Sequence, residues 1–209
     1  VFTLLFLNNV DYTHTLILWA GGITMVTGVL GAVAQYEFRR LLSFHIVSQI
    51  GYMIMGLGFF TPLALGGTVF FIVHNIFVKT NLFLVSGVSH RLHGTYDLKQ
   101  LGGLYRTHPW IGMLFLLSAL SLAGVPPLSG FFGKLVLIKA GLGIGQFMLV
   151  AAALGVSLLT LFSMTKIWAE AFWKPLPQGT PAHGSGTGMA LMLGPIVALA
   201  VLAVVLGVA

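Results

Sequence analysis

Three ionisable side chains lie deep inside apolar stretches of this sequence, where charged residues are rare. They are His74, Lys79 and Lys134. Dehydration favours the neutral form of an amine, and histidine titrates near neutral pH, so groups of these types can take up and release protons. Inside a membrane, ionisable residues of this kind are typical of proton relays. The alternative for each is structural, as a lysine that bonds backbone carbonyls or a histidine that packs two helices together.

Lys134 follows a segment in which a helix cannot continue unbroken. The residues expected to break it are Pro126, Pro127, Gly130 and Gly133. Proline removes a backbone donor and clashes with the preceding turn, so the helix predicted over 110–141 is interrupted here. Within a bilayer, such an interruption is tolerated only where it is packed in protein or lines a wet cavity. Short half-helices of this kind indicate an ion site in a transporter.

His74 and Lys79 belong to one predicted helix, over about 65–89, but to different faces of it. Five residues turn a regular helix by about 140° relative to the starting position. Asn81 follows His74 by seven residues and shares its face, whereas Asn75 precedes Lys79 by four and shares the other. This helix is therefore predicted to be polar toward two neighbours.

His45 is a further candidate. It lies about one turn inside the helix predicted over 41–60, and it is either a point where protons enter or a hydrogen-bonded interfacial residue. No carboxylate lies deep in any apolar stretch, so a sodium site built from carboxylates is not expected here. The sequence has no cysteine and no P-loop or dinucleotide-binding motif, and His90 and His93 lack companion ligands. We therefore expect neither a cofactor nor a bound metal.

The composition is that of a membrane protein. The 209 residues are 57% hydrophobic and 7% charged, with a mean hydropathy of +1.01, whereas soluble domains carry about 25% charged residues. Six stretches are long and apolar enough to cross a bilayer. They cover about 15–35, 41–60, 65–89, 110–141, 146–173 and 189–208. This predicts an all-α, polytopic transmembrane helix bundle with one broken helix.

The positive charges indicate orientation in a membrane rather than nucleic-acid binding. The net charge is +6, but the basic residues lie in loops or singly inside apolar stretches, never as a stripe. Those on one predicted side are Arg39, Arg40, Arg91, Lys99, Arg106, Lys166 and Lys174. The opposite side has at most Lys139, so by the positive-inside rule the first side is cytoplasmic. We expect loops 36–40, 90–109 and 174–188 to be cytoplasmic, and the protein to lie in the inner (cytoplasmic) cell membrane.

No separate soluble domain is expected. The predicted segments are an upstream tail and external loop over 1–14, five helices over 15–175, a linker over 176–188 and a last transmembrane helix over 189–209. The linker is rich in Pro, Gly, Ser and Thr, which is typical of a loop. Because the sequence begins at Val1 in an apolar tail, we expect the amino-terminal part of a longer protein to precede it.

Three stretches carry a resemblance to a known family. They read AQYEFRRLLSFHIVSQIGYMIMGLGF, FFIVHNIFVKTNLFLVSGV and LAGVPPLSGFFGKLVLI. They resemble the antiporter-like membrane subunits, which are shared by Mrp-type multi-subunit sodium/proton antiporters and the membrane arm of respiratory complex I. Within that family, the D subunits of Mrp complexes are the most similar group. The resemblance covers about 15–175 and implies that these helices form the second of two inverted five-helix repeats.

The resemblance implies a proton-translocating subunit of a cation (Na+)/H+ antiporter. It places Lys134 at the family's broken-helix lysine, and His74 and Lys79 in its central polar axis. A glutamate and a lysine of the first repeat would lie upstream of Val1, so this half is not expected to transport by itself. The implied partners are other membrane subunits of a hetero-oligomeric complex, H+, Na+ and the lipid bilayer, with no nucleic acid.

Two alternative functions remain open at this stage. In a complex I-like NADH-quinone oxidoreductase or a membrane-bound hydrogenase, redox chemistry in partner subunits would drive the same row of groups. The chain would then be part of a translocase rather than a transporter. In an inert structural subunit, Lys79 and Lys134 would face lipid headgroups or form closed bonds with no water nearby.

Overall fold

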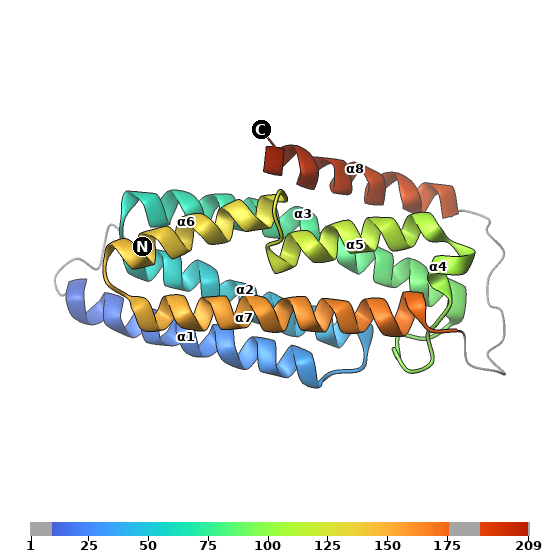
Figure 1. Cartoon of the computed structure of the whole chain (residues 1–209), viewed down its shortest axis with the longest axis horizontal. Helices are drawn as coiled ribbons and strands as arrows, with labels where there is room; N and C mark the ends of the chain where they lie inside the picture. The colour runs from blue at the N-terminus through green and yellow to red at the C-terminus, as the bar shows by residue number, and fades with distance from the viewer. Residues whose placement is uncertain (1–9, 176–188, 209) are drawn as a thin grey trace.

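The computed structural model describes residues 10–175 and 189–208, and within them every regular element is a helix (Figure 1). The helices are α1 (Val10–Ala34), α2 (Phe38–Phe59), α3 (Pro62–His93), α4 (Leu104–Thr107), α5 (Pro109–Ala123), α6 (Ser129–Gly143), α7 (Phe147–Ile167) and α8 (Met189–Val208). A turn of wider π-helix (η1, Trp168–Trp173) continues α7. The all-α prediction is confirmed. Of the tail and external loop predicted over 1–14, residues 1–9 lie outside the described residues and residues 10–14 belong to α1. The linker predicted over 176–188 also lies outside the described residues.

Within the described residues, four helices are individually long and apolar enough to cross a membrane. They are Tyr12–Ala34, Phe38–Phe59, Pro62–His93 and Phe147–Trp173. The apolar helices Pro109–Ala123 and Leu191–Gly207 are shorter. The predicted span over 110–141 is divided between α5 and α6, which lie end to end with a non-helical connection near the middle of the bundle (Figure 1).

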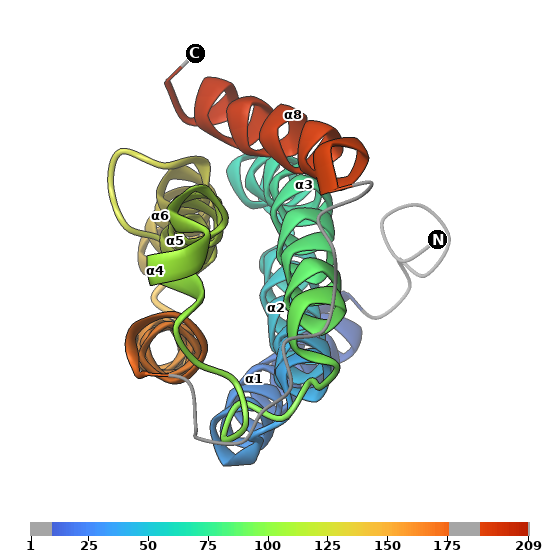
Figure 2. The ribbon, with the colours of Figure 1, turned by 90° about the vertical axis from the view of Figure 1, so that its right-hand side faces the viewer.

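The helices form two facing layers closed by a crossing helix. Figure 2 shows α1, α2 and α3 side by side in one layer, with α7 and the α5–α6 pair opposite them. Helix α8 packs across α3, α5 and α6 at one edge of both layers. The space between the layers is filled by two clusters of buried apolar side chains, one around Phe38, Phe115 and Phe172 and one around Met25 and Phe71.

Glycines allow α1 and α2 to approach closely. A Cβ atom added at Gly28 would lie 2.7 Å from the Cα of Ser48, and one added at Gly51 would lie 2.7 Å from the Cα of Met25. Small residues at helix contacts are the usual means of association where lipid removes the hydrophobic driving force between helices. Helices α1 and α2 are thereby held in close contact within the first layer.

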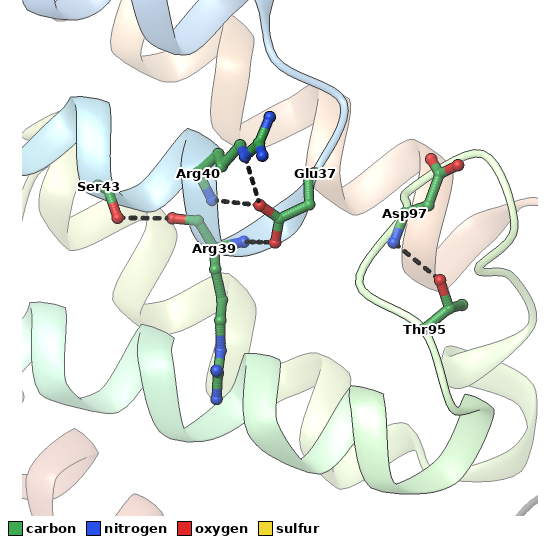
Figure 3. A network of polar contacts seen from close by, with 6 residues as sticks. All are labelled: Glu37, Arg39, Arg40, Ser43, Thr95 and Asp97. Carbon is green, nitrogen blue, oxygen red and sulfur yellow. Dashed lines mark hydrogen bonds and ion pairs between the residues drawn. The ribbon is translucent and has the colours of Figure 1, made fainter.

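All the basic residues predicted for one side lie at one end of the bundle, where α1, α3 and α7 end and α2 and α5 begin. The loop between α1 and α2 and the loop after α3 contact each other there. The Glu37 carboxylate accepts hydrogen bonds from the backbone N–H groups of Arg39 and Arg40 and so caps α2 (Figure 3). The backbone of Glu37 pairs with that of Asp97 in the loop after α3. We call this region the basic end.

Lys166 stabilises the basic end from α7. Its Nζ donates to the carbonyl oxygens of Val33 (2.8 Å) and Gln35 (2.6 Å), where α1 ends. The amine also lies 3.8 Å from the centroid of the Tyr36 ring. The last carbonyls of a helix lack hydrogen-bond donors within the helix and carry partial negative charge. A lysine there donates the missing hydrogen bonds and neutralises that charge.

Candidate functional site

The helix break lies where the proline pair predicts it. Helix α5 ends at Ala123, Gly124 adopts the left-handed conformation (φ 91°), and α6 begins at Ser129. Pro126 and Pro127 are joined by a cis peptide bond within this connection. The break directs the last carbonyls of α5 toward the interior of the bundle, and these carbonyls need a donor.

Gly130 and Gly133, expected as part of the break, lie inside α6 instead. Their role is close packing. A Cβ at Gly130 would collide with the carbonyl oxygen of Ser121 and lie 2.9 Å from Nε2 of His74, and a Cβ at Gly133 would lie 2.9 Å from the Phe71 ring. Once the prolines have ended α5, the chain is free to enter a new helix, and the glycines let α6 lie against α5 and α3.

Lys134 supplies the donor that the end of α5 lacks. Its Nζ donates to the carbonyl oxygens of Leu122 and Ala123, each at 3.0 Å, and the side chain is 4% exposed. The amine lies 5.2 Å from the centroid of the Tyr52 ring on α2. It therefore points into the bundle and not toward lipid. The bond to carbonyls freed by the break is the arrangement that the structural alternative for this lysine predicts.

His74 contacts the other side of the same break. Its Nδ1 is 2.8 Å from Oγ of Ser129, the first residue of α6, and that hydroxyl is 3.3 Å from the hydroxyl of Ser121 on α5. The imidazole is buried and stacks on Phe71 of its own helix. Its Nε2 has no hydrogen-bond partner among the described residues. One ring nitrogen is thus held at the break, and the other meets no hydrogen-bonding group of the described residues.

Lys79 is held much less firmly. Its Nζ makes one long contact, 3.5 Å to the carbonyl oxygen of Leu42 on α2. On the other face of α3, Asn81 donates to the Ser118 hydroxyl of α5 at 2.7 Å. Helix α3 is therefore polar toward α2 on one face and toward α5 and α6 on the other, as the spacing of its polar residues predicted.

His45 lies in the interior of the bundle, about two turns from the start of α2. It is fully buried, and its Nε2 is 2.6 Å from the Ser163 hydroxyl of α7. Tyr52 was not among the predicted site residues. Its hydroxyl donates to the carbonyl of Ala153 and lies 2.9 Å from the hydroxyl of Ser157. A periodic signal was present, because Tyr52 follows His45 by seven residues and shares its face of α2.

Within residues 10–175 and 189–208, no group of three or more His, Asp or Glu residues is arranged to hold a metal ion. The residues of the site are of types that can take up and release protons. Two amines and an imidazole are buried in this part of the bundle, and Lys134 and His74 both contact the helix break. The fold and the site together define a polytopic helical membrane protein built around an interrupted helix.

The comparison with protein families agrees with this class. Residues 1–160 match the family described as NADH:quinone oxidoreductase/Mrp antiporter, transmembrane. The chain belongs to this family, which confirms the resemblance found in the sequence.

Two curated relatives are Na+/H+ antiporter D subunits. That of Alkalihalophilus pseudofirmus is 50% identical over 208 residues, covering 100% of this chain and 42% of the relative. That of Bacillus subtilis is 35% identical over 192 residues, covering 90% and 38%. The chain therefore spans less than half the length of the curated relatives it matches.

Solved structures agree on the fold. The Mrp complex from Dietzia sp. DQ12-45-1b matches with a TM-score of 0.82 at 36% identity, covering 91% of this chain and 44% of that one. The archaeal membrane-bound sulfane sulfur reductase matches with a TM-score of 0.81 at 28% identity, covering 94% and 32%. Respiratory complex I from Thermus thermophilus with bound NADH matches at 0.81 and 22% identity, covering 93% and 41%, which is a likeness of fold alone.

Proposed function

We propose that this chain is the second half of a proton-translocating subunit in a multi-subunit Na+/H+ antiporter. In this proposal protons pass along His74, Lys79 and Lys134 near the middle of the membrane. The observation that carries it is the position of Lys134, a buried amine that faces the interior of the bundle at a helix break. The identity to antiporter D subunits supports the choice of antiport.

The geometry suggests the order in which these groups bind and release a proton. A protonated Lys134 is stabilised by the negative carboxyl end of α5, whose last carbonyls accept its hydrogen bonds. A proton arriving at Lys79 adds a second positive charge within electrostatic range of the first. Like charges repel each other more strongly in surroundings of low dielectric than in water, so loading one site favours unloading the other. His74 and Lys134 contact the same helix break, and in this proposal His74 passes the proton between the two lysines.

The orientation and the partners are also proposals. The excess of lysine and arginine at the basic end supports a cytoplasmic location for loops 36–40 and 90–109 in an inner-membrane protein. The matching Mrp structure and the names of the relatives support assembly with other membrane subunits and transport of Na+ and H+. The upstream half of the subunit would supply the remaining proton sites.

Replacing Lys134 tests the proposal. In the full-length subunit, within the assembled complex, Lys134→Ala should abolish proton-coupled Na+ efflux from membrane vesicles while the subunits still purify together. Lys139→Ala is a matched control, because Lys139 lies on the exposed face of the same helix. Normal transport by Lys134→Ala would remove the hypothesis.

A second candidate is redox-driven proton pumping within a respiratory membrane complex. The fold likeness to complex I and to the sulfane sulfur reductase favours it, although identity to the antiporter subunits is higher. The same row of groups would serve, driven by electron transfer in partner subunits. Purification of the native complex with a tag on this subunit separates the two candidates, since redox cofactors co-purify only in the second.

A further inference from the structure

We propose that α2 and α7 enclose a water-binding path that joins the Lys79 region to Lys134 independently of His74. We call it the α2–α7 track, and it consists of His45, Gln49 and Tyr52 on α2 with Ser157, Thr160 and Ser163 on α7. The ligand is water, which carries protons by exchange. This inference rests on the proposed function, because it gives that proton row a second connection.

The spacing of the track residues places them on facing sides of the two helices. On α2 the positions are i, i+4 and i+7, which lie on one face. On α7 a hydroxyl recurs every third residue. His45, Gln49 and Tyr52 are each at most 1% exposed, and Thr160 and Ser163 are also buried. Burying so many polar side chains along one helix contact costs free energy unless they find partners.

Both ends of the track are closed by direct bonds between the helices. At one end His45 pairs with Ser163, and at the other Tyr52 pairs with Ser157 and the backbone of Ala153. These bonds fix α2 and α7 relative to each other over about two turns.

Gln49 lies between these closed ends and is not bonded. Neither its amide nitrogen nor its amide oxygen has a hydrogen-bond partner among the described residues, and Nδ1 of His45 has none either. At 1% exposure, Gln49 is beyond the reach of lipid headgroups or another subunit. A buried polar group left without a partner costs about 1–3 kcal/mol. Water, which donates and accepts at once, satisfies such a site.

The two ends of the track meet the two lysines. Lys79 donates to the carbonyl of Leu42, which precedes His45 by three residues and so neighbours it on α2. Tyr52 presents its ring to Lys134 at 5.2 Å. A proton leaving Lys79 can pass to the imidazole of His45 and then to water at Gln49 before reaching Lys134. Each carrier gives up one proton for each one it accepts, so nothing is consumed.

The test replaces Gln49 in the full-length, assembled complex. Gln49→Leu keeps the approximate volume but cannot bind water, and we expect proton-coupled Na+ efflux to fall several-fold while subunit assembly is unchanged. Gln49→His can bind water and exchange protons, and it should restore most of the rate. Ser163→Ala, which removes the partner of His45, should also slow transport. Ser48→Ala is the matched control, since Ser48 adjoins Gln49 but donates to Met25 on α1.

A second measurement does not depend on transport. A high-resolution cryo-electron microscopy map of the complex should show an ordered water at the Gln49 amide, and this density should disappear in Gln49→Leu. A Gln49 amide bonded only to protein atoms would overturn the inference, as would wild-type transport by Gln49→Leu. If Lys134→Ala transported normally, the proposed function would fail, whereas the water at Gln49 would be judged by the map alone.

Discussion

The two buried lysines are held in opposite ways. Lys134 makes two bonds of 3.0 Å to the carbonyls at the end of α5, whereas Lys79 makes one contact of 3.5 Å to a carbonyl inside α2. A carbonyl inside a helix is already engaged by the helix's own ladder, but those at a helix end are not. A helix break therefore provides free carbonyls that bind an amine, whereas the carbonyls of an intact helix bind an amine only weakly.

This difference suggests that the two amines have different roles in proton transfer. Lys134 has a fixed position at the negative end of a half-helix, which stabilises its charged form. Lys79 can move at a small cost in hydrogen-bond energy, because its single hydrogen bond is long. We therefore interpret Lys134 as a docking point for a proton and Lys79 as a mobile carrier. Variants of each lysine and of the helix contacts around it distinguish the two roles.

Lys134→Gln separates docking from proton transfer. Glutamine retains an N–H donor for the α5 carbonyls but cannot carry a proton. We expect complete loss of proton-coupled transport, measured in vesicles, with the thermal unfolding midpoint of the complex close to that of wild type. If Lys134→Gln transported normally, the amine would be only a helix cap, as the structural alternative holds.

Lys79→Met should greatly slow transport without a matching loss of stability. The methionine preserves most of the side-chain volume, and the lost contact is a single 3.5 Å bond. We expect a decrease of at most about 1 kcal/mol in the free energy of unfolding, the usual value of one ordinary hydrogen bond. Denaturation of the purified subunit in detergent measures it. A large destabilisation would mean that Lys79 is anchored like Lys134.

Gly130→Ala should disturb Lys134 while leaving Lys79 in place. The added methyl group would collide with the Ser121 carbonyl and push α6 away from α5. The bonds from Lys134 to the α5 carbonyls should lengthen, and transport should fall several-fold. Gly143→Ala is the control on the same helix, because a Cβ there meets nothing within 4 Å. Equal rates for the two variants would show that the α5–α6 contact does not position the amine.

Lys166→Met should have the smallest effect on function. This lysine also bonds two carbonyls at a helix end, but it is only half-buried and lies at the basic end. We expect a loss of about 1 kcal/mol in stability and an unchanged transport rate per assembled complex. A transport defect as severe as that of Lys134→Gln would show that capping alone explains both lysines.

Much of the fold could be predicted because the bilayer constrains it strongly. Long apolar stretches must be helices, since lipid satisfies no backbone hydrogen bonds. The proline pair predicted the interruption, and residue spacing predicted that α3 would be polar toward two neighbours. Gly130 and Gly133 were placed in the break because glycine often ends helices. Their real role depends on which helices lie nearby, and a local pattern does not contain that information.

The helices, the break near Pro126 and Pro127, and the ionisable groups deep in apolar segments could all be predicted from the amino-acid sequence. These follow from short-range steric and solvation effects. Only the tertiary structure decided that Lys134 caps α5, that Lys79 reaches α2, and that His45 meets Ser163 across 118 residues. Such contacts depend on how whole helices pack, which is a property of the assembled bundle and not of any one segment.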